Sequence, residues 1–521
     1  MKKAFMMTIV LLCAVAQGAW AQWQPSDTEY TRLTEEGTSA QYGLHTLATA
    51  DGKTIVTWVV YSRETMGYQL YLQILDAQGY QTFAKGGITL NSKPTPTDVP
   101  NYAIALAPNG DILLAYNDSR DGHGSRYYLY RYTQTGQPVW SADGVAFQTK
   151  SLGSNGDDES ATESDCALVC QGDNIFFAVC RVEEKVIDGS VVNERQWQVK
   201  VFNANGEVAT PEPLCINSLV MYLLPAPDGD VYAIYDTPFY NVLAQRLDAT
   251  LTDRWDEPVE VDWDALNKDI TYRPHVCVDA TADGGVAMAY NKVSDSQTVT
   301  VFNYLSPDGK VISNSQAPAI GDIEDGRVDD FIMATSGNTS IVLYVFAQEG
   351  IDKLRYNAIG HDGHYLWDAT MTLSEHDEAY SFEIIDIIPQ DDGWVLVYGK
   401  GTAYATIRSN FYITKIGLDG TTLWTKQILP DEFSMNASNL VTIGQYAHLY
   451  FTENINFTTE GPFLLTTDIT NANTGIQSLP KESVSEGAEA NAWYTLDGHR
   501  LPAQPSCAGI YINKGIKILV K

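Results

Sequence analysis

Residues 109–116 read NGDILLAY, a tight turn followed by an apolar strand that ends in an aromatic side chain. Asn-Gly supplies the positive backbone angles that a tight turn needs, and the branched apolar residues after it favour extended structure. The same pattern recurs eight times, with turn glycines spaced 51 to 62 residues apart: Gly52, Gly110, Gly172, Gly229, Gly284, Gly337, Gly393 and Gly444. Self-similarity at one period is typical of a repeat fold.

Each repeat also carries a large side chain five to seven residues after its turn glycine. It is Val179 in the third repeat and an aromatic residue in the others: Trp58, Tyr116, Tyr235, Tyr290, Tyr344, Tyr398 and Tyr450. A second turn follows, usually Asp-Gly or Asn-Gly, although the fourth repeat lacks this glycine. An aromatic such as Trp140 or Trp367 then often opens the next strand. We therefore expect four strands per repeat, with the first aromatic of each in the core.

Four-stranded units of this length cannot bury both faces alone, but they can when they are arranged radially. The pattern predicts an all-β fold, a β-propeller of eight blades. A seven-bladed ring, in which the third repeat is not a blade, is the alternative blade number. An open solenoid is the main rival to a propeller, and a β-sandwich array is the weaker alternative. The last repeat stops before a fourth strand, and residues 28–37 resemble the missing one. We expect this N-terminal strand to close the last blade.

The second and fourth repeats resemble a family of secreted bacterial β-propeller repeats. The resemblance rests on the segments NDSR (117–120), YLYR (128–131) and NVLAQRLD (241–248), together with Trp140 and Trp255. It extends loosely over residues 42–470. It implies a propeller, but such repeats share no single activity, and a fold does not determine a function.

The N-terminus has the layout of a secretory signal peptide. A basic start is followed by a short apolar run and the segment AWA at 19–21, so we expect residues 1–21 to be cleaved. No other stretch is long and apolar enough to be a transmembrane segment. We expect residues 22–472 to form the propeller. Cleavage of the signal peptide would leave six of the seven cysteines. Three of them, Cys166, Cys170 and Cys180, lie in predicted strands, where buried free thiols are favoured over disulfides.

The C-terminal residues differ in composition from the repeats. Residues 473–490 are polar and predict a linker. Residues 491–521 resemble the sorting tails of Bacteroidetes proteins exported by type IX secretion, on the positions Leu496, Gly498, Arg500, Gly509, Lys517 and Lys521. The resemblance implies contact with that secretion machinery and a secreted or cell-surface location; the periplasm is the alternative. A small terminal β-module without a sorting role is the competing interpretation.

Composition excludes some partners. The chain has 65 acidic and 33 basic side chains, a formal net charge of −32. A field of this sign repels phosphate backbones, so we expect no nucleic-acid partner. With 44% hydrophobic and 19% charged residues, the chain is expected to fold.

Two loops are candidates for a site. Asp118, Arg120, Asp121 and His123 follow a strand of the second repeat and could contact a ligand, although the same residues suit turn hydrogen bonds. Asp157, Asp158 and Glu159 precede the third repeat and are the kind of oxygen donors that Ca²⁺ prefers; a solvated acidic surface is the alternative. His361 and His364 flank a polar turn, where we expect solvent-exposed side chains.

No catalytic motif stands out in the sequence. We therefore expect an exported, non-catalytic binding module, with a glycan or a surface protein as ligand. Two alternatives remain: a propeller glycoside hydrolase or sialidase-like enzyme, and a structural component of a cell-surface assembly. Convergent carboxylates with raised pKa values would favour the enzyme. A broad exposed apolar patch would favour the assembly component.

Overall fold

The computed structural model describes most of the chain. The described residues are 25–35, 41–62, 66–90, 101–118, 120, 126–152, 162–187, 190–236, 242–262, 276–294, 297–313, 326–348, 351–367, 370–376, 380–402, 409–455, 458–470, 493–494, 500–501, 509–513 and 516–520. Tertiary contacts divide the chain into two compact units, residues 1–472 and 473–521.

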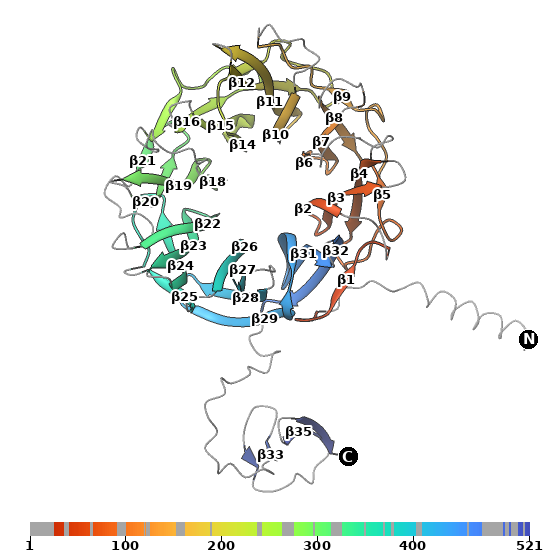
Figure 1. The fold of residues 1–521 in the computed structure, drawn as a ribbon, viewed down its shortest axis with the longest axis vertical. Coiled ribbons are helices and arrows are strands. Elements are labelled where there is room, and N and C mark those ends of the chain that lie inside the picture. Colours follow the sequence, from red (N-terminus) through yellow and green to blue (C-terminus); the bar gives the residue numbers. More distant parts are fainter. Residues whose placement is uncertain are drawn as a thin grey trace, which may run out of the picture. The chain divides into compact units, whose positions relative to one another are not determined.

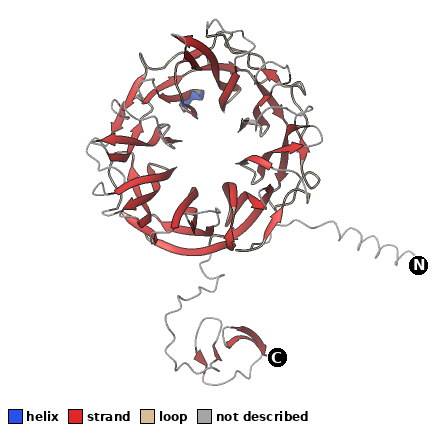
Figure 2. Cartoon of the chain, viewed as in Figure 1, coloured by secondary structure: helices blue, strands red, loops and turns tan. Residues whose placement is uncertain are grey.

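The first unit is a ring of eight four-stranded antiparallel blades, so the predicted β-propeller is confirmed (Figures 1 and 2). The first four blades are β2 (Gln41–Ala48), β3 (Thr54–Ser62), β4 (Gly67–Leu75) and β5 (Ile88–Thr89); β6 (Tyr102–Leu106), β7 (Ile112–Asp118), β8 (Arg126–Tyr132) and β9 (Val145–Ala146); β10 (Thr162–Gln171), β11 (Asn174–Ile187), β12 (Ser190–Phe202) and β13 (Leu214–Ile216); β14 (Met221–Pro225), β15 (Val231–Asp236), β16 (Val242–Leu247) and β17 (Val259–Asp262).

The other four blades complete the ring. They are β18 (Val276–Ala280), β19 (Val286–Ser294), β20 (Gln297–Leu305) and β21 (Val311–Ser313); β22 (Gly326–Ser336), β23 (Thr339–Gln348), β24 (Ile351–Gly360) and β25 (Met371–His376); β26 (Tyr380–Gln390), β27 (Gly393–Thr402), β28 (Ser409–Gly417) and β29 (Thr422–Phe433); β30 (Met435–Ile443), β31 (Tyr446–Ile455) and β32 (Thr458–Asp468) with β1 (Tyr30–Arg32). The third repeat is a full blade, so the seven-bladed alternative is wrong. One short 3-10 turn, η1 (Pro227–Gly229), lies between β14 and β15.

The N-terminal strand closes the last blade, as the sequence predicts. β1 pairs antiparallel with β32, with Tyr30 opposite Leu465 and Arg32 opposite Phe463. The Tyr30 ring packs edge-on against the rings of Phe433, Phe451 and Phe463, with centroid distances of 5.2 to 5.7 Å. The outer edge of β32 is therefore covered by the start of the same unit.

The core consists of apolar clusters between neighbouring blades. Eight such clusters follow one another around the ring. The cluster that closes the circle joins Val56 and Trp58 of the first blade to Tyr450 and Leu464 of the last. The recurring aromatics, with Val179, all lie in second strands and are buried, as expected.

The second recurring aromatic differs from the expectation in position. Trp140 and Trp367 lie in the connections before β9 and β25, not at the start of those strands. Each indole Nε1 donates a hydrogen bond to a turn carbonyl of the next blade, Trp140 to Ala204 and Trp367 to Leu418, both at 3.1 Å. The ring thus packs on the turn of its neighbour, which holds it out of the strand.

The two ends of the blades carry different connections. The first-to-second and third-to-fourth strand connections begin with tight turns, most of them at positive-φ glycines. In an antiparallel blade the second-to-third and blade-to-blade connections lie at the opposite end. The described strand ends next to the two loops predicted as sites, Asp118 at the end of β7 and Thr162 at the start of β10, lie at this second face. We call it the loop face.

The second unit contains one small sheet. Its strand order is β34 (Arg500–Leu501), β33 (Trp493–Tyr494), β35 (Gly509–Asn513) and β36 (Ile516–Val520). Arg500, Gly509 and Lys517 of the predicted sorting tail lie on these strands. Leu496, Gly498 and Lys521 fall outside the described residues, as do the predicted signal peptide and linker. Within the described residues, no helix is long and apolar enough to cross a membrane.

Candidate functional site in the central tunnel

The first strand of each blade lies toward the centre of the ring (Figure 1). We call these inner strands the wall, and the space that they line the tunnel. A cavity of about 590 Å³ lies along this wall. Five consecutive blades contribute to it through β10, β14, β18, β22 and β26. Its lining is Cys166, Ala167, Met221, Tyr222, Leu223, Leu224, Val276, Cys277, Val278, Ile332, Met333, Ile385 and Asp386.

Most residues of the lining are aliphatic or sulfur-containing, but the exposed surface of the cavity is divided almost evenly between polar and apolar atoms. Among its polar groups, the Tyr222 hydroxyl is already engaged, because it donates a hydrogen bond to the Val276 carbonyl oxygen at 3.2 Å. Ligand pockets typically combine apolar side chains with a few polar groups that orient the ligand. The aliphatic side chains of this wall could pack against an apolar group.

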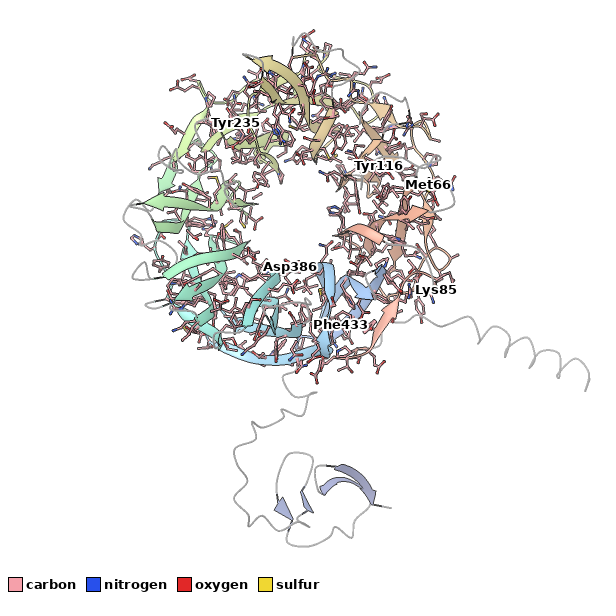
Figure 3. All side chains as sticks on the ribbon, viewed as in Figure 1. Met66, Lys85, Tyr116, Tyr235, Asp386 and Phe433 are labelled. Carbon is pink, nitrogen blue, oxygen red and sulfur yellow. The ribbon has the colours of Figure 1, made fainter. Side chains whose placement is uncertain are left out.

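Asp386 is the carboxylate of the cavity lining and lies at the inner edge of the ring (Figure 3). Its two oxygens accept hydrogen bonds from the backbone amides of Ile387 at 2.8 Å and Leu440 at 3.1 Å. The second bond ties blade seven to blade eight. Burial raises the pKa of the Asp386 carboxyl, and the two amide bonds oppose that shift. The Asp386 side chain thus holds two blades together as well as lining the cavity.

Asp279 repeats this arrangement on β18. It accepts a hydrogen bond from the Thr335 amide of the next blade at 2.8 Å, and burial raises its pKa. Two inner-strand carboxylates therefore fasten neighbouring blades together.

Cys166, one of the two cysteines of the cavity lining, is protonated at neutral pH. Burial raises the pKa of Cys166 to about 12. Since the thiolate is the reactive form, this thiol is a poor nucleophile. Cys166, Cys170 and Cys215 are free thiols, and the predicted strand positions of the first two are confirmed on β10.

Of the binding loop predicted from sequence, the structure describes Asp118 and Arg120. The Arg120 guanidinium donates to both Asp118 oxygens, to the Asp143 carbonyl at 2.8 Å and to the Tyr130 hydroxyl. It also lies over the Tyr128 ring, 4.0 Å from its centroid. These contacts engage the Arg120 guanidinium within its own blade. They favour turn hydrogen bonds over ligand contact as the role of Asp118 and Arg120. Asp121 and His123 lie outside the described residues.

The predicted calcium ligands Asp157, Asp158 and Glu159 also lie outside the described residues. The described part of the chain contains no group of three or more His, Cys, Asp or Glu side chains placed to hold a metal. Next to this segment, Glu163 accepts hydrogen bonds from the Tyr127 amide at 2.6 Å and the Thr149 hydroxyl at 2.7 Å. Glu163 therefore joins blades two and three.

The expectation of an exposed His361 is wrong, whereas His364 is exposed. The His361 side chain is only 6% exposed and stacks on the Tyr304 ring of the preceding blade, with 4.5 Å between centroids. Its Nδ1 lies 3.9 Å from Asp283 Oδ2. Burial lowers the pKa of His361, and Asp283 opposes that shift. A contact across blades, which the local turn pattern does not show, buries the ring.

Comparisons with known proteins find only remote structural similarities. No protein-family model matches the chain, and no curated protein matches it. Among solved structures, a polysaccharide lyase, Uly1, is 10% identical with a TM-score of 0.42, over 87% of this chain and 94% of that one. The β-propeller domain of the Trilobed protease from Pyrococcus furiosus is 12% identical with a TM-score of 0.35, over 76% and 99%.

A mutant of Trypanosoma rangeli sialidase is 9% identical with a TM-score of 0.35, over 86% of this chain and 60% of that one. Similarities this remote carry no argument about activity.

Proposed function

We propose that this chain is an exported, non-catalytic binding module that receives an apolar group of its ligand in the central tunnel. The observation that carries the proposal is the cavity of about 590 Å³, which is lined mainly by aliphatic and sulfur-containing residues. Burial of apolar surface is favourable by roughly 25 cal/mol per Å², so one large side chain in such a site contributes substantially to affinity.

The hydrogen bonds of the carboxylates near the tunnel, Asp279 and Asp386, support a binding role over a hydrolytic one. A glycosidase needs two carboxyl groups that converge on one bond. Asp279 and Asp386 instead accept hydrogen bonds from backbone amides of the next blade. Their raised pKa values follow from burial between blades.

A surface protein is a better ligand for this site than a glycan. Glycan recognition by stacking uses aromatic rings, and Tyr222 is the single aromatic residue among the described residues that line the cavity. Most side chains of the tunnel wall are aliphatic or thioether groups, which pack against an apolar group but offer little hydrogen bonding to a sugar hydroxyl. We therefore assign the tunnel to an apolar side chain that a partner protein presents at the cell surface. The predicted signal peptide and sorting tail provide the route to that location.

The test begins with a neutral solvatochromic dye, Nile red, titrated into the purified mature chain. We expect saturable binding with a blue-shifted emission. Ile332→Asn places an amide on the tunnel wall and is expected to weaken binding at least tenfold. Leu366→Asn is the matched control, because Leu366 is an aliphatic side chain 46% exposed in another part of the molecule.

A screen of immobilised surface proteins and glycans, with and without Ca²⁺, then uses the same variants. Saturable binding of a protein that Ile332→Asn weakens and Leu366→Asn does not would support the proposal. Saturable glycan binding that neither variant changes would overturn it. Turnover of a glycan would favour the hydrolase alternative, and stable assembly with envelope proteins through another surface would favour the structural one.

A further inference from the structure

Each inner strand presents one of its edges to the tunnel. It is the end strand of its sheet, so a neighbouring strand covers one edge and the other edge faces the centre of the ring (Figure 1). In an antiparallel pair, alternate residues turn both of their main-chain groups away from the partner strand. Alternate peptide groups of the wall therefore point into the tunnel, where they bond to side chains, to water or to a ligand.

On β14 the residues that point inward are Met221 and Leu223. The Ala226 amide donates to the Asp230 carbonyl oxygen at 3.0 Å, and this bond fixes the alternation along the pair that β14 forms with β15. Pro225, which has no N–H, occupies the next inward position, where an edge strand tolerates proline. Among the described residues, no hydrogen bond reaches the inward main-chain groups of Met221 and Leu223.

The inner edge of β22, two blades further on, is capped by carboxylates instead. The Phe331 amide donates to Asp330 Oδ1 at 2.9 Å. The Thr335 amide donates to Asp279 Oδ2 at 2.8 Å. The contrast shows that inward amides of this wall can be satisfied by side chains, and that those of β14 are not.

The cavity of the candidate site lies along this open edge. The runs Met221–Leu224 and Val276–Val278 line it without a gap. Since consecutive side chains of a strand point to opposite faces, an unbroken run indicates that the cavity follows the edge of the strand. On β18 the Tyr222 hydroxyl already bonds to the Val276 carbonyl oxygen at 3.2 Å, so β14 has the longer open edge.

We propose that the open edge of β14 takes up an extended segment of the partner protein, as a fifth strand of the fourth blade inside the tunnel. The inference rests on the proposed function and states how the partner enters. Its main chain bonds to Met221 and Leu223, and its apolar side chains pack on the aliphatic side chains of the wall. The main-chain bonds supply affinity for any extended segment, and the wall supplies selectivity.

The segment is expected to be neutral or basic. Among the described residues that line the cavity, Asp386 carries the only charge, and it is negative. The whole chain has a net charge of −32, so an acidic segment is repelled as it approaches. A second copy of this chain is repelled for the same reason.

The experiment titrates a fluorescein-labelled peptide, KVTVTVK with an amidated end, with the purified mature chain and follows fluorescence anisotropy. We expect saturable binding that slows the amide hydrogen exchange of Met221 and Leu223. The same peptide N-methylated at its five central residues keeps the side chains but loses those donors, and we expect its affinity to fall at least tenfold. The acidic version, EVTVTVE, should bind about threefold more weakly.

Leu223→Pro tests the edge in the protein. It removes an inward N–H without removing a bond of the ladder to β15, and the native Pro225 lies on the same edge. We expect at least tenfold weaker peptide binding. Ile104→Pro is the matched control. The Ala107 amide donates to the Asp111 carbonyl oxygen at 2.9 Å in the same kind of turn, so Ile104 holds the corresponding inward position on β6, outside the cavity lining.

Equal weakening by both proline variants, or an unchanged affinity of the N-methylated peptide, would overturn strand addition. Saturable binding of Nile red in that case would leave the proposed function standing, because the dye needs no main-chain bond. Concentration-dependent dimers that Leu223→Pro abolishes would also overturn strand addition by a partner, in favour of a second copy. If Leu223→Pro lacks the circular dichroism spectrum of the folded chain, the N-methylated peptide decides.

Discussion

Gly206 and Trp140 show how one residue determines the contact between two blades. Gly206 has a φ of 80°, and a Cβ there would lie 2.9 Å from the Trp140 ring. The turn glycine thus meets two requirements, a left-handed backbone and room for the indole of the preceding blade. In the fourth blade, which lacks this glycine, Leu251 takes the left-handed conformation, with a φ of 60°. Leucine bears the strain that glycine avoids elsewhere.

We expect Gly206→Ala to lower the free energy of unfolding by about 2 to 4 kcal/mol, from backbone strain together with the clash. The matched control is Gly172→Ala. Gly172 has a φ of 60° but no atom within 4 Å of the added Cβ, so only the strain of about 1 kcal/mol should remain. Chemical denaturation measures both values. If both variants lose the same free energy of unfolding, the contact with Trp140 does not add to the cost of the substitution.

His448 links stability to pH. The side chain is fully buried, its Nδ1 lies 3.0 Å from the Thr466 hydroxyl, and burial lowers its pKa to about 3. Above pH 6.5 the imidazole is neutral in both states, so this contribution to stability is complete. Between pH 6.5 and about 3 only the unfolded chain gains the proton, so stability falls by up to about 1.4 kcal/mol per pH unit.

We expect His448→Gln to reduce that slope, measured as the free energy of unfolding at pH 7 and at pH 4. The exposed His364→Gln variant should retain the slope of the unmodified chain. If both variants keep the full slope, other groups account for the acid sensitivity.

At the scale of the element, β1 stabilises a whole blade. Besides its pairing with β32, Arg32 forms an ion pair with Glu460 at 2.7 Å, and Leu33 is buried against the first and last blades. A chain that begins at Glu35 lacks this strand. We expect its thermal midpoint to fall by several degrees and the amides of β32 to lose protection from hydrogen exchange.

The control for that truncation is a chain that begins at Pro25. It keeps β1 and should melt like the mature protein. Unchanged protection of β32 in the shorter chain would show that blade eight is stable with three strands.

Much of the fold follows from local pattern, but the candidate site does not. Gly110 and Tyr116 lie in one stretch of chain, so their spacing predicts a turn and a core strand without knowledge of any other blade. The tunnel lining comes from five blades, and a segment such as Val276–Val278 has the same pattern whether it faces a core or a tunnel. His361 is a similar case, because its burial depends on Tyr304, more than fifty residues away in the sequence.

At the scale of the molecule, the net charge of −32 opposes compaction. We expect the thermal midpoint to rise by a few degrees between 10 and 200 mM NaCl, because salt screens this repulsion. Choline chloride at the same ionic strength should act equally, which separates screening from specific ion binding. A midpoint that falls with salt would contradict this account.

Calcium chloride at matched ionic strength tests the acidic loop predicted from sequence. A further rise in the midpoint that is absent when Asp157, Asp158 and Glu159 are changed to amides would support a calcium site. No further rise would leave those residues as a solvated acidic surface.

The closure by β1 has one more consequence. The Ser26 amide donates to the Thr466 carbonyl oxygen at 2.8 Å, so the two ends of the propeller unit are adjacent. A short covalent link could join them, and a new start could then be made in any connection between blades. Such circular permutants should rebuild the same ring, since no blade is first except by the order of translation.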